Sequence, residues 1–161
     1  MNTYTYKLTA RSGIIHKSLV QIFRDKHRSL ANYTALIEEQ RQLTFAEFWQ
    51  NTDAYTKFLQ KTGIKKGQVV AIVCPMPSID VAELLMACLQ LEVAPLIINL
   101  SDKFQKLEPE DGNAYGYIVH KDFQSHIPAG TAAAYGREQA VGNQLLWLQI
   151  NDEEKATPTD A

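Results

Sequence analysis

Residues 43–100 read LTFAEFWQNTDAYTKFLQKTGIKKGQVVAIVCPMPSIDVAELLMACLQLEVAPLIINL and are the most informative part of this chain. An amphipathic helical segment is followed by an apolar run, a second helical segment and a second apolar run, with short turns between them. This alternation is typical of a mainly parallel sheet flanked by helices. We therefore predict a three-layer α/β fold in which strands at residues 69–74 and 95–100 are adjacent. They should be parallel, because a helix connects them.

The first helix is predicted at residues 44–62. Thr44 is a good N-cap, and Glu47 can bond back to the Thr44 N–H, so the two residues form a capping box. Gly63 can adopt the left-handed conformation that ends a helix. Residues at spacings of three and four give this helix one continuous side that is mostly apolar: Phe45, Phe48, Trp49, Thr52, Tyr55, Phe58 and Leu59.

A strand and a helix form the centre of the helix–strand–helix–strand series. Residues 69–74 are all apolar and mostly β-branched, which indicates a strand buried on both faces. Residues 78–91 form a helix that is apolar around much of its circumference. Two N-terminal caps are open for it: Ser78 alone, or a capping box of Asp80 with Glu83.

Toward the N-terminus, residues 15–31 have apolar side chains on one side and are predicted to form an amphipathic helix. The basic residues scattered along it favour a solvated face over a binding patch. Residues 34–38 read as a short strand. Residues 39–42 then reverse the chain, which predicts a hairpin before the capped helix.

After residue 100 the pattern is weaker. Residues 103–113 are polar and read as a loop, and residues 115–120 as a strand. Residues 124–142 contain three glycines and a proline, which indicates a connector. Residues 145–150 are an apolar strand by length and composition, and residues 151–161 form a polar, loose tail.

Composition limits the classes of function. A chain of 161 residues can build one ordinary core, so we predict a single α/β domain over residues 1–161. The net charge of −2 offers no basic field for nucleic acid. No apolar run approaches the roughly 20 residues of a membrane span, and the N-terminus does not read as a signal peptide. Cys74 and Cys88 are expected to be buried thiols in a reducing compartment, which predicts a cytoplasmic protein.

The search for catalytic groupings returns no site residue. Phosphate-binding loops, dinucleotide fingerprints and nucleophile elbows are absent from the sequence. The four histidines, His16, His27, His120 and His126, have no metal-ligand spacing. His16 and His27 can share one side of a long helix, whereas His120 is expected to be partly buried. Glu38 and Glu39 are adjacent, so in a strand they point to opposite faces. We therefore assign no catalytic, cofactor-binding or metal-binding residue.

Three motifs together carry a resemblance to a known superfamily. They are LTFAEF at residues 43–48, GIKKGQVVAI at 63–72 and LQLEVAPL at 89–96. In this order the sequence resembles the start of the adenylate-forming superfamily, which contains acyl-CoA synthetases, fatty-acyl-AMP ligases, nonribosomal adenylation domains and luciferases. The resemblance covers roughly residues 14–100. One departure is the pair Leu91-Glu92, where the family usually has Ala-Gly.

The resemblance implies what this chain contributes. TPTDA at residues 157–161 looks like the segment that precedes the family's phosphate loop, so the residues that bind ATP and Mg, and the late catalytic lysine, are expected beyond Ala161. We therefore expect an N-terminal fragment of an ATP-dependent acid:thiol ligase that binds no cofactor and is inactive alone. The alternatives are a stand-alone, non-catalytic interaction or assembly module derived from such a ligase, and an unrelated small α/β binding domain.

The apolar helix also predicts a partner. One sheet can cover only one side of the helix at residues 79–91, so its other side is expected to meet the rest of the ligase or a second copy of this chain. A specific contact of this kind buries at least about 1,000 Å². We expect a homo-oligomer on this basis, and neither nucleic acid nor a membrane as partner.

Overall fold

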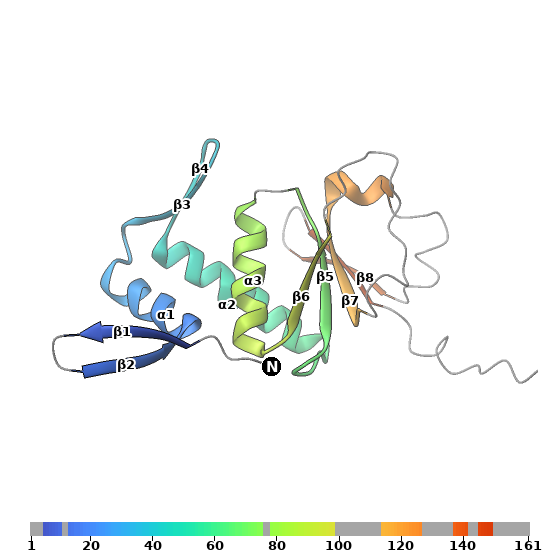
Figure 1. The fold of residues 1–161 in the computed structure, drawn as a ribbon. Helices are drawn as coiled ribbons and strands as arrows, with labels where there is room; N and C mark the ends of the chain where they lie inside the picture. Colours follow the sequence, from blue (N-terminus) through green and yellow to red (C-terminus); the bar gives the residue numbers. More distant parts are fainter. Residues whose placement is uncertain are drawn as a thin grey trace, which may run out of the picture.

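The computed structural model describes residues 5–10, 13–75, 78–98, 114–126, 137–141 and 145–149. Its main body has three layers, which Figure 1 shows from left to right: helix α1 (Leu19–Ser29), then helices α2 (Phe45–Lys61) and α3 (Ile79–Leu91), then a sheet. The fold is α/β with helices flanking a sheet, as the sequence predicts.

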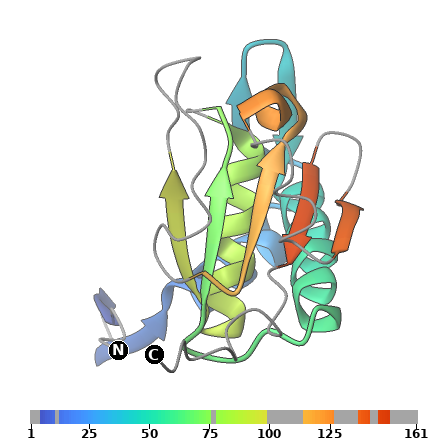
Figure 2. The same ribbon diagram turned by 90° about the vertical axis from the view of Figure 1, so that its right-hand side faces the viewer.

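The described strands of the main sheet have the order β6-β5-β7-β9-β8. They are β5 (Val69–Val73), β6 (Ala94–Ile98), β7 (Gly116–His120), β8 (Arg137–Val141) and β9 (Leu145–Gln149). Strand β5 pairs in parallel with both β6 and β7, whereas β9 is antiparallel to β7 and to β8. Figure 2 shows the three parallel strands side by side. The predicted parallel pair is confirmed.

The two central helices begin at well-formed caps. The Thr44 hydroxyl accepts a hydrogen bond from the Glu47 N–H (3.2 Å), and the Glu47 carboxylate accepts from the Thr44 N–H (2.8 Å). The Thr44 hydroxyl also donates to the Glu47 carboxylate at 2.9 Å. The two bonds that the carboxylate accepts, from the Thr44 N–H first and the Thr44 hydroxyl second, lower the pKa of Glu47. At α3, the Ser78 hydroxyl accepts from the Asp80 N–H (3.2 Å). Ser78 is therefore the cap of α3, and Glu83 is left for another role.

The predicted helix at residues 15–31 is present, but its first four residues belong to a strand. Residues 13–18 form strand β2 (Gly13–Ser18), which pairs with β1 (Thr5–Ala10), and α1 begins only after Ser18. The Ser18 hydroxyl accepts from the Gln21 N–H (3.2 Å) and so starts the helix there. His16 consequently lies in a strand and His27 in the helix, so they do not share one helical side.

The predicted hairpin is present as β3 (Thr34–Glu38) and β4 (Arg41–Thr44). Glu38 ends β3, but Glu39 lies in the turn with φ of 50°. The alternation of faces along a strand therefore does not apply to Glu38 and Glu39, and the prediction made from it is wrong.

The region expected to be a connector is more regular than predicted. It contains the last three residues of a short 3₁₀ helix, η2 (Lys121–His126), and strand β8. The β8 segment has few β-branched residues, and its pairing with β9 is a tertiary contact that local composition does not reveal. The predicted loop at 103–113, the ends of two predicted strands at 99–100 and 150, and the tail at 151–161 lie outside the described residues.

The core lies between the sheet and the two central helices. Its buried side chains come from all of these elements: Leu59, Val70, Ile72, Cys74, Val81, Leu84, Ala87, Cys88, Val93, Ile118, Leu145 and Trp147. A second buried cluster, which includes Ala71, Val73, Tyr117 and Val119, lies on the opposite face of the sheet. Both cysteines are free and buried, as predicted.

The other side of α3 is covered within the chain. Met86 is 5% exposed and packs with Phe48 and Trp49 of α2, in a cluster that Phe23 of α1 joins. Leu89 is the one large apolar side chain of α3 that is clearly exposed, at 42%. The expectation that α3 needs a second molecule as cover is therefore wrong, because two helices of this chain already supply it. The oligomeric state itself stays a prediction.

Candidate functional site

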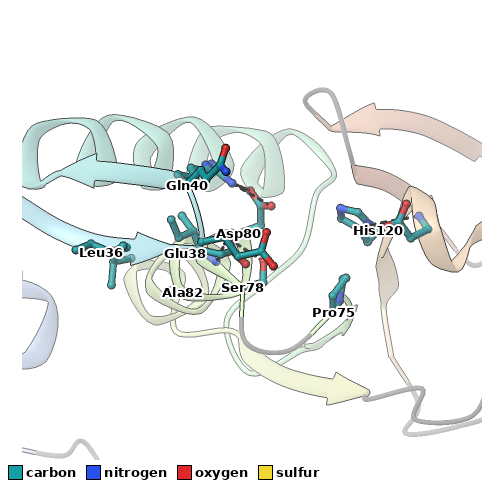
Figure 3. Close-up of a pocket in the computed structure, with 13 residues that line it drawn as sticks. Leu36, Glu38, Gln40, Pro75, Ser78, Asp80, Ala82 and His120 are labelled. Atoms are coloured by element: carbon teal, nitrogen blue, oxygen red, sulfur yellow. Dashed lines mark hydrogen bonds and ion pairs between the residues drawn. The ribbon is translucent and has the colours of Figure 1, made fainter.

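A cavity of about 990 Å³ lies at the end of the sheet where the parallel strands finish. Its walls are the β3–β4 hairpin, the first turn of α3 and the residues that follow β5 and β7 (Figure 3). The residues that line it are Leu36, Ile37, Glu38, Glu39, Gln40, Arg41, Pro75, Ser78, Ile79, Asp80, Ala82, His120 and Asp122.

The sheet topology explains why this place is hollow. Strand β5 lies between β6 and β7, so the chain leaves β5 toward one side through α3 and later returns to the other side. In open α/β sheets, such a reversal opens a crevice outside the carboxyl ends of the strands, and ligands often bind there. Pro75 follows β5 and His120 ends β7, so the cavity occupies this crevice.

One wall of the cavity is tied together by polar contacts between distant residues. Arg41 Nη1 lies 3.3 Å from Asp80 Oδ1 and 3.4 Å from Asp80 Oδ2. The Tyr55 hydroxyl donates to the same Asp80 Oδ1 at 3.5 Å, and burial, followed by the Asp80 charge, raises the pKa of Tyr55. Glu38 Oε2 accepts from the Ile79 N–H (3.3 Å). The hairpin is thus attached to the start of α3 by two charged groups.

His120 forms the opposite wall. Its Nδ1 accepts a hydrogen bond from the Asp122 N–H (3.2 Å) and lies 3.4 Å from Asp122 Oδ2. A nitrogen that accepts from a backbone N–H carries no proton, so the neutral ring has its proton on Nε2. The Asp122 carboxylate lies within reach of the same nitrogen, which cannot accept from the N–H and donate to the carboxylate at once, so these two contacts are alternatives.

The thiol of Cys74, which directly follows β5, is not a nucleophile. Burial, with a smaller contribution from the Asp80 charge, raises the pKa of Cys74 to about 12. Burial also raises the pKa of Cys88 to about 12. Because the thiolate is the reactive form, neither cysteine is prepared for covalent catalysis.

Glu83, one turn after Asp80, is a polar residue whose role the sequence analysis missed. Its side chain is fully buried, and Asn51 Nδ2 donates to its Oε1 at 2.8 Å. Burial raises the pKa of Glu83 to about 7, whereas the Asn51 hydrogen bond lowers it. The sequence did contain a signal of its burial, because Glu83 is a charged residue within the apolar stripe of a helix. We considered Glu83 only as part of a possible cap.

Comparison with known proteins places the chain in a family. A family model described as AMP-binding enzyme matches residues 23–108, more than half of the 161 residues. The chain belongs to the AMP-binding enzyme family. No curated protein matches the sequence.

Solved structures of other proteins show the same fold. The N-terminal subdomain of NpsA from Klebsiella oxytoca is 24% identical, with a TM-score of 0.50, over 55% of this chain and 23% of that chain. VinN is 15% identical, with a TM-score of 0.50, over 53% of this chain and 23% of that chain. The matched part is thus about a quarter of the length of these proteins. The fold of the matched part is that of the N-terminal subdomain of NpsA.

The AMP-binding family implies ATP and Mg, and the cavity does not fit them. Its lining has four carboxylates, Glu38, Glu39, Asp80 and Asp122, and one arginine, Arg41, which already pairs with Asp80. A triphosphate needs cations and backbone N–H groups, so this lining would repel it. Among the described residues there is also no group of three His, Cys, Asp or Glu side chains that could hold a metal ion.

The four histidines are not brought together. His16 lies in β2, His27 stacks on Trp49 at the α1–α2 contact, and His126 ends η2. Of the two histidines whose side chains the structure describes, His27 and His120, the second lines the cavity, and its partial burial was predicted correctly. The helices that the structure describes also lack the length and apolar character needed to cross a bilayer.

Proposed function

We propose that this chain is the N-terminal part of an ATP-dependent acid:thiol ligase of the acyl-CoA synthetase type. The parent enzyme activates a carboxylic acid, such as a fatty acid, as an acyl-adenylate with release of pyrophosphate, and then transfers the acyl group to a thiol in the cytoplasm. The observation that carries this proposal is the family match over residues 23–108, which includes α2, β5, α3 and β6 in sequence.

The role of this chain in the parent is to build the sheet and not to perform the chemistry. ATP and Mg are held by the rest of the ligase, which is the main partner of this chain. Two features support this division: the acidic lining of the cavity, and the absence of a glycine-rich phosphate loop from the sequence. N–H groups and cations have to stabilise the polyphosphate charge. The acidic cavity does not supply them, and neither does the rest of a sequence that lacks such a loop.

Calorimetric titration of the 161-residue chain with ATP and Mg tests the proposed division. We expect a Kd no tighter than about 1 mM, equivalent to about −4 kcal/mol, and no acid-dependent exchange of pyrophosphate into ATP. A micromolar Kd would contradict the division. A matched titration after Glu38→Gln and Asp122→Asn would then show whether the nucleotide uses the cavity, because neutralising its carboxylates should strengthen binding there.

A second candidate function is favoured by the packing of α3. Because α1 and α2 cover this helix, the chain has the cover that a stand-alone, non-catalytic interaction or assembly module needs. The nucleotide sequence after the Ala161 codon distinguishes the candidates. An in-frame phosphate loop supports the ligase, whereas a stop codon supports the module. Light scattering then tests the proposed homo-oligomer, which a monomer at high concentration would contradict.

A further inference from the structure

The contact between α2 and α3 contains a buried acid within an otherwise mainly apolar interface. Glu83 is 0% exposed, and the residues around it in α3 include the buried Val81, Leu84 and Ala87. Asn51 of α2 donates to one carboxyl oxygen at 2.8 Å. The other oxygen, Oε2, has no hydrogen-bond partner within the described part of the chain.

The charges that face this carboxyl are mostly of its own sign. Asp80 of α3 and Glu38 of β3 disfavour a second negative charge, and Arg41 of β4 favours it. Arg41 is already engaged by Asp80, and from α2 the Glu83 carboxyl is faced by Asn51 and by the hydroxyl of Tyr55. An ionised Glu83 would therefore be a buried carboxylate with one hydrogen bond and no ion pair of its own.

The neutral and the ionised form of Glu83 differ in the free energy that their burial costs. A buried carboxylic acid with one unmade hydrogen bond costs a few kcal/mol at most, whereas a buried unpaired charge costs much more. We propose that the contact between α2 and α3 depends on the protonation state of Glu83. As a neutral acid, Glu83 allows the two helices to pack, and its ionisation weakens their contact. This inference goes beyond the proposed function, because it concerns how the fold responds to pH.

The direction of the pH effect follows from linkage. In the folded chain burial raises the pKa of Glu83 to about 7, from an ordinary value of 4.5. Below the ordinary value Glu83 is protonated in both the folded and the unfolded chain, so stability does not change with pH through this group. As pH rises from there toward 7, the unfolded chain ionises first and becomes relatively more stable. The contribution of Glu83 to folding therefore falls across this window and stays low above it.

The protonation state of Glu83 should also affect the cavity, because α3 contains Glu83 and forms part of the cavity wall. Ser78, Ile79, Asp80 and Ala82 in the first turn of α3 line the cavity, and Glu83 is the next residue. Weakening of the α2–α3 contact at higher pH should thus be accompanied by faster hydrogen exchange of the α3 amides near this wall.

The test compares unfolding of the 161-residue chain and two variants between pH 5 and pH 8. Between these limits, the unfolding equilibrium constant of the wild type should rise by at least about tenfold more than that of Glu83→Gln. The matched control is Asp53→Asn, which removes one negative charge from a partly exposed residue of α2 and should keep the wild-type profile. Parallel profiles of wild type and Glu83→Gln would overturn the proposal.

A second measurement does not depend on the folding of the glutamine variant. Carbon-13 NMR titration of the wild-type side-chain carboxyls should find Glu83 changing protonation near pH 7, and Asn51→Leu should move that midpoint upward, because the carboxylate loses its one hydrogen bond. A midpoint between 4 and 5, the ordinary range for glutamate, would overturn the proposal.

Discussion

Helices α2 and α3 lie side by side in the same layer, but they are held by different kinds of contact. The cap of α2 is made by Thr44 and Glu47, three residues apart. The N-terminal half of α3 is bound by residues distant in sequence: Glu38 to Ile79, Arg41 to Asp80 and Asn51 to Glu83, at separations of 41, 39 and 32 residues. A helix held by local contacts can be recognised from sequence, whereas the polar residues of α3 acquire their roles only in the folded chain.

The two helices also end differently. Gly63 follows α2 with φ of 84°, and Glu92 ends α3 with φ of 53°. Glycine adopts this left-handed conformation without a steric penalty, and glutamate does not. The sequence therefore marks the end of α2 but not the end of α3. Four changes test how far this contrast between the helices extends.

The largest effect is expected from the buried face of α3. Leu84 is 0% exposed in the core, so Leu84→Ala should lower the free energy of unfolding by about 2–5 kcal/mol, through lost burial and the cavity it leaves. Leu89→Ala on the exposed side of the same helix is the control and should cost far less. Chemical denaturation measures both. Equal losses would mean that the outer side of α3 is covered by another molecule in solution.

The helix ends should respond in opposite directions. Gly63→Ala should destabilise by about 1–2 kcal/mol, because alanine is strained at this φ and its Cβ would lie 3.3 Å from the Tyr115 hydroxyl. Glu92→Gly should instead stabilise by a few tenths of a kcal/mol, after loss of the exposed ion pair with Lys66. Thermal unfolding of both variants tests the comparison, and destabilisation by Glu92→Gly would refute it.

The N-terminal caps should differ less. Thr44→Ala removes the capping box and should cost about 1 kcal/mol. Ser78→Ala should cost less, because Glu38 still accepts from the Ile79 N–H at the start of α3. The double variant Ser78→Ala, Glu38→Ala removes both acceptors at the start of α3, so it should show the full cost of a lost cap. If Ser78→Ala alone costs as much as Thr44→Ala, the bond from β3 contributes nothing to capping.

The smallest effect is expected from the Arg41–Asp80 pair. Arg41 is 43% exposed at its side chain, so the coupling in a double-mutant cycle with Arg41→Ala and Asp80→Asn should be about 0.5 kcal/mol or less. The coupling should decrease in 1 M salt, which screens exposed charges. A coupling that is large and independent of salt would show that the hairpin encloses this pair in solution.

The candidate site was much less predictable than the fold. Among the described residues, three that were considered from the sequence as possible site residues line the cavity: His120, Glu38 and Glu39. These residues come from β7 and from the β3–β4 hairpin, about 80 positions apart, and no local pattern connects them. Glu83 was visible as a charge in an apolar stripe, but its burial depends on Asn51 of another helix.

Short-range signals in the sequence were sufficient for α2, for the run that forms β5, for the β3–β4 hairpin and for the parallel crossover through α3. Each depends on interactions within a few residues, on burial periodicity or on the handedness of a short connection. Tertiary structure alone decided the pairing of β8, the cover over α3 and the cavity at the end of β5 and β7. These features depend on which distant surfaces exclude water from one another, and that free energy is not contained in any single segment.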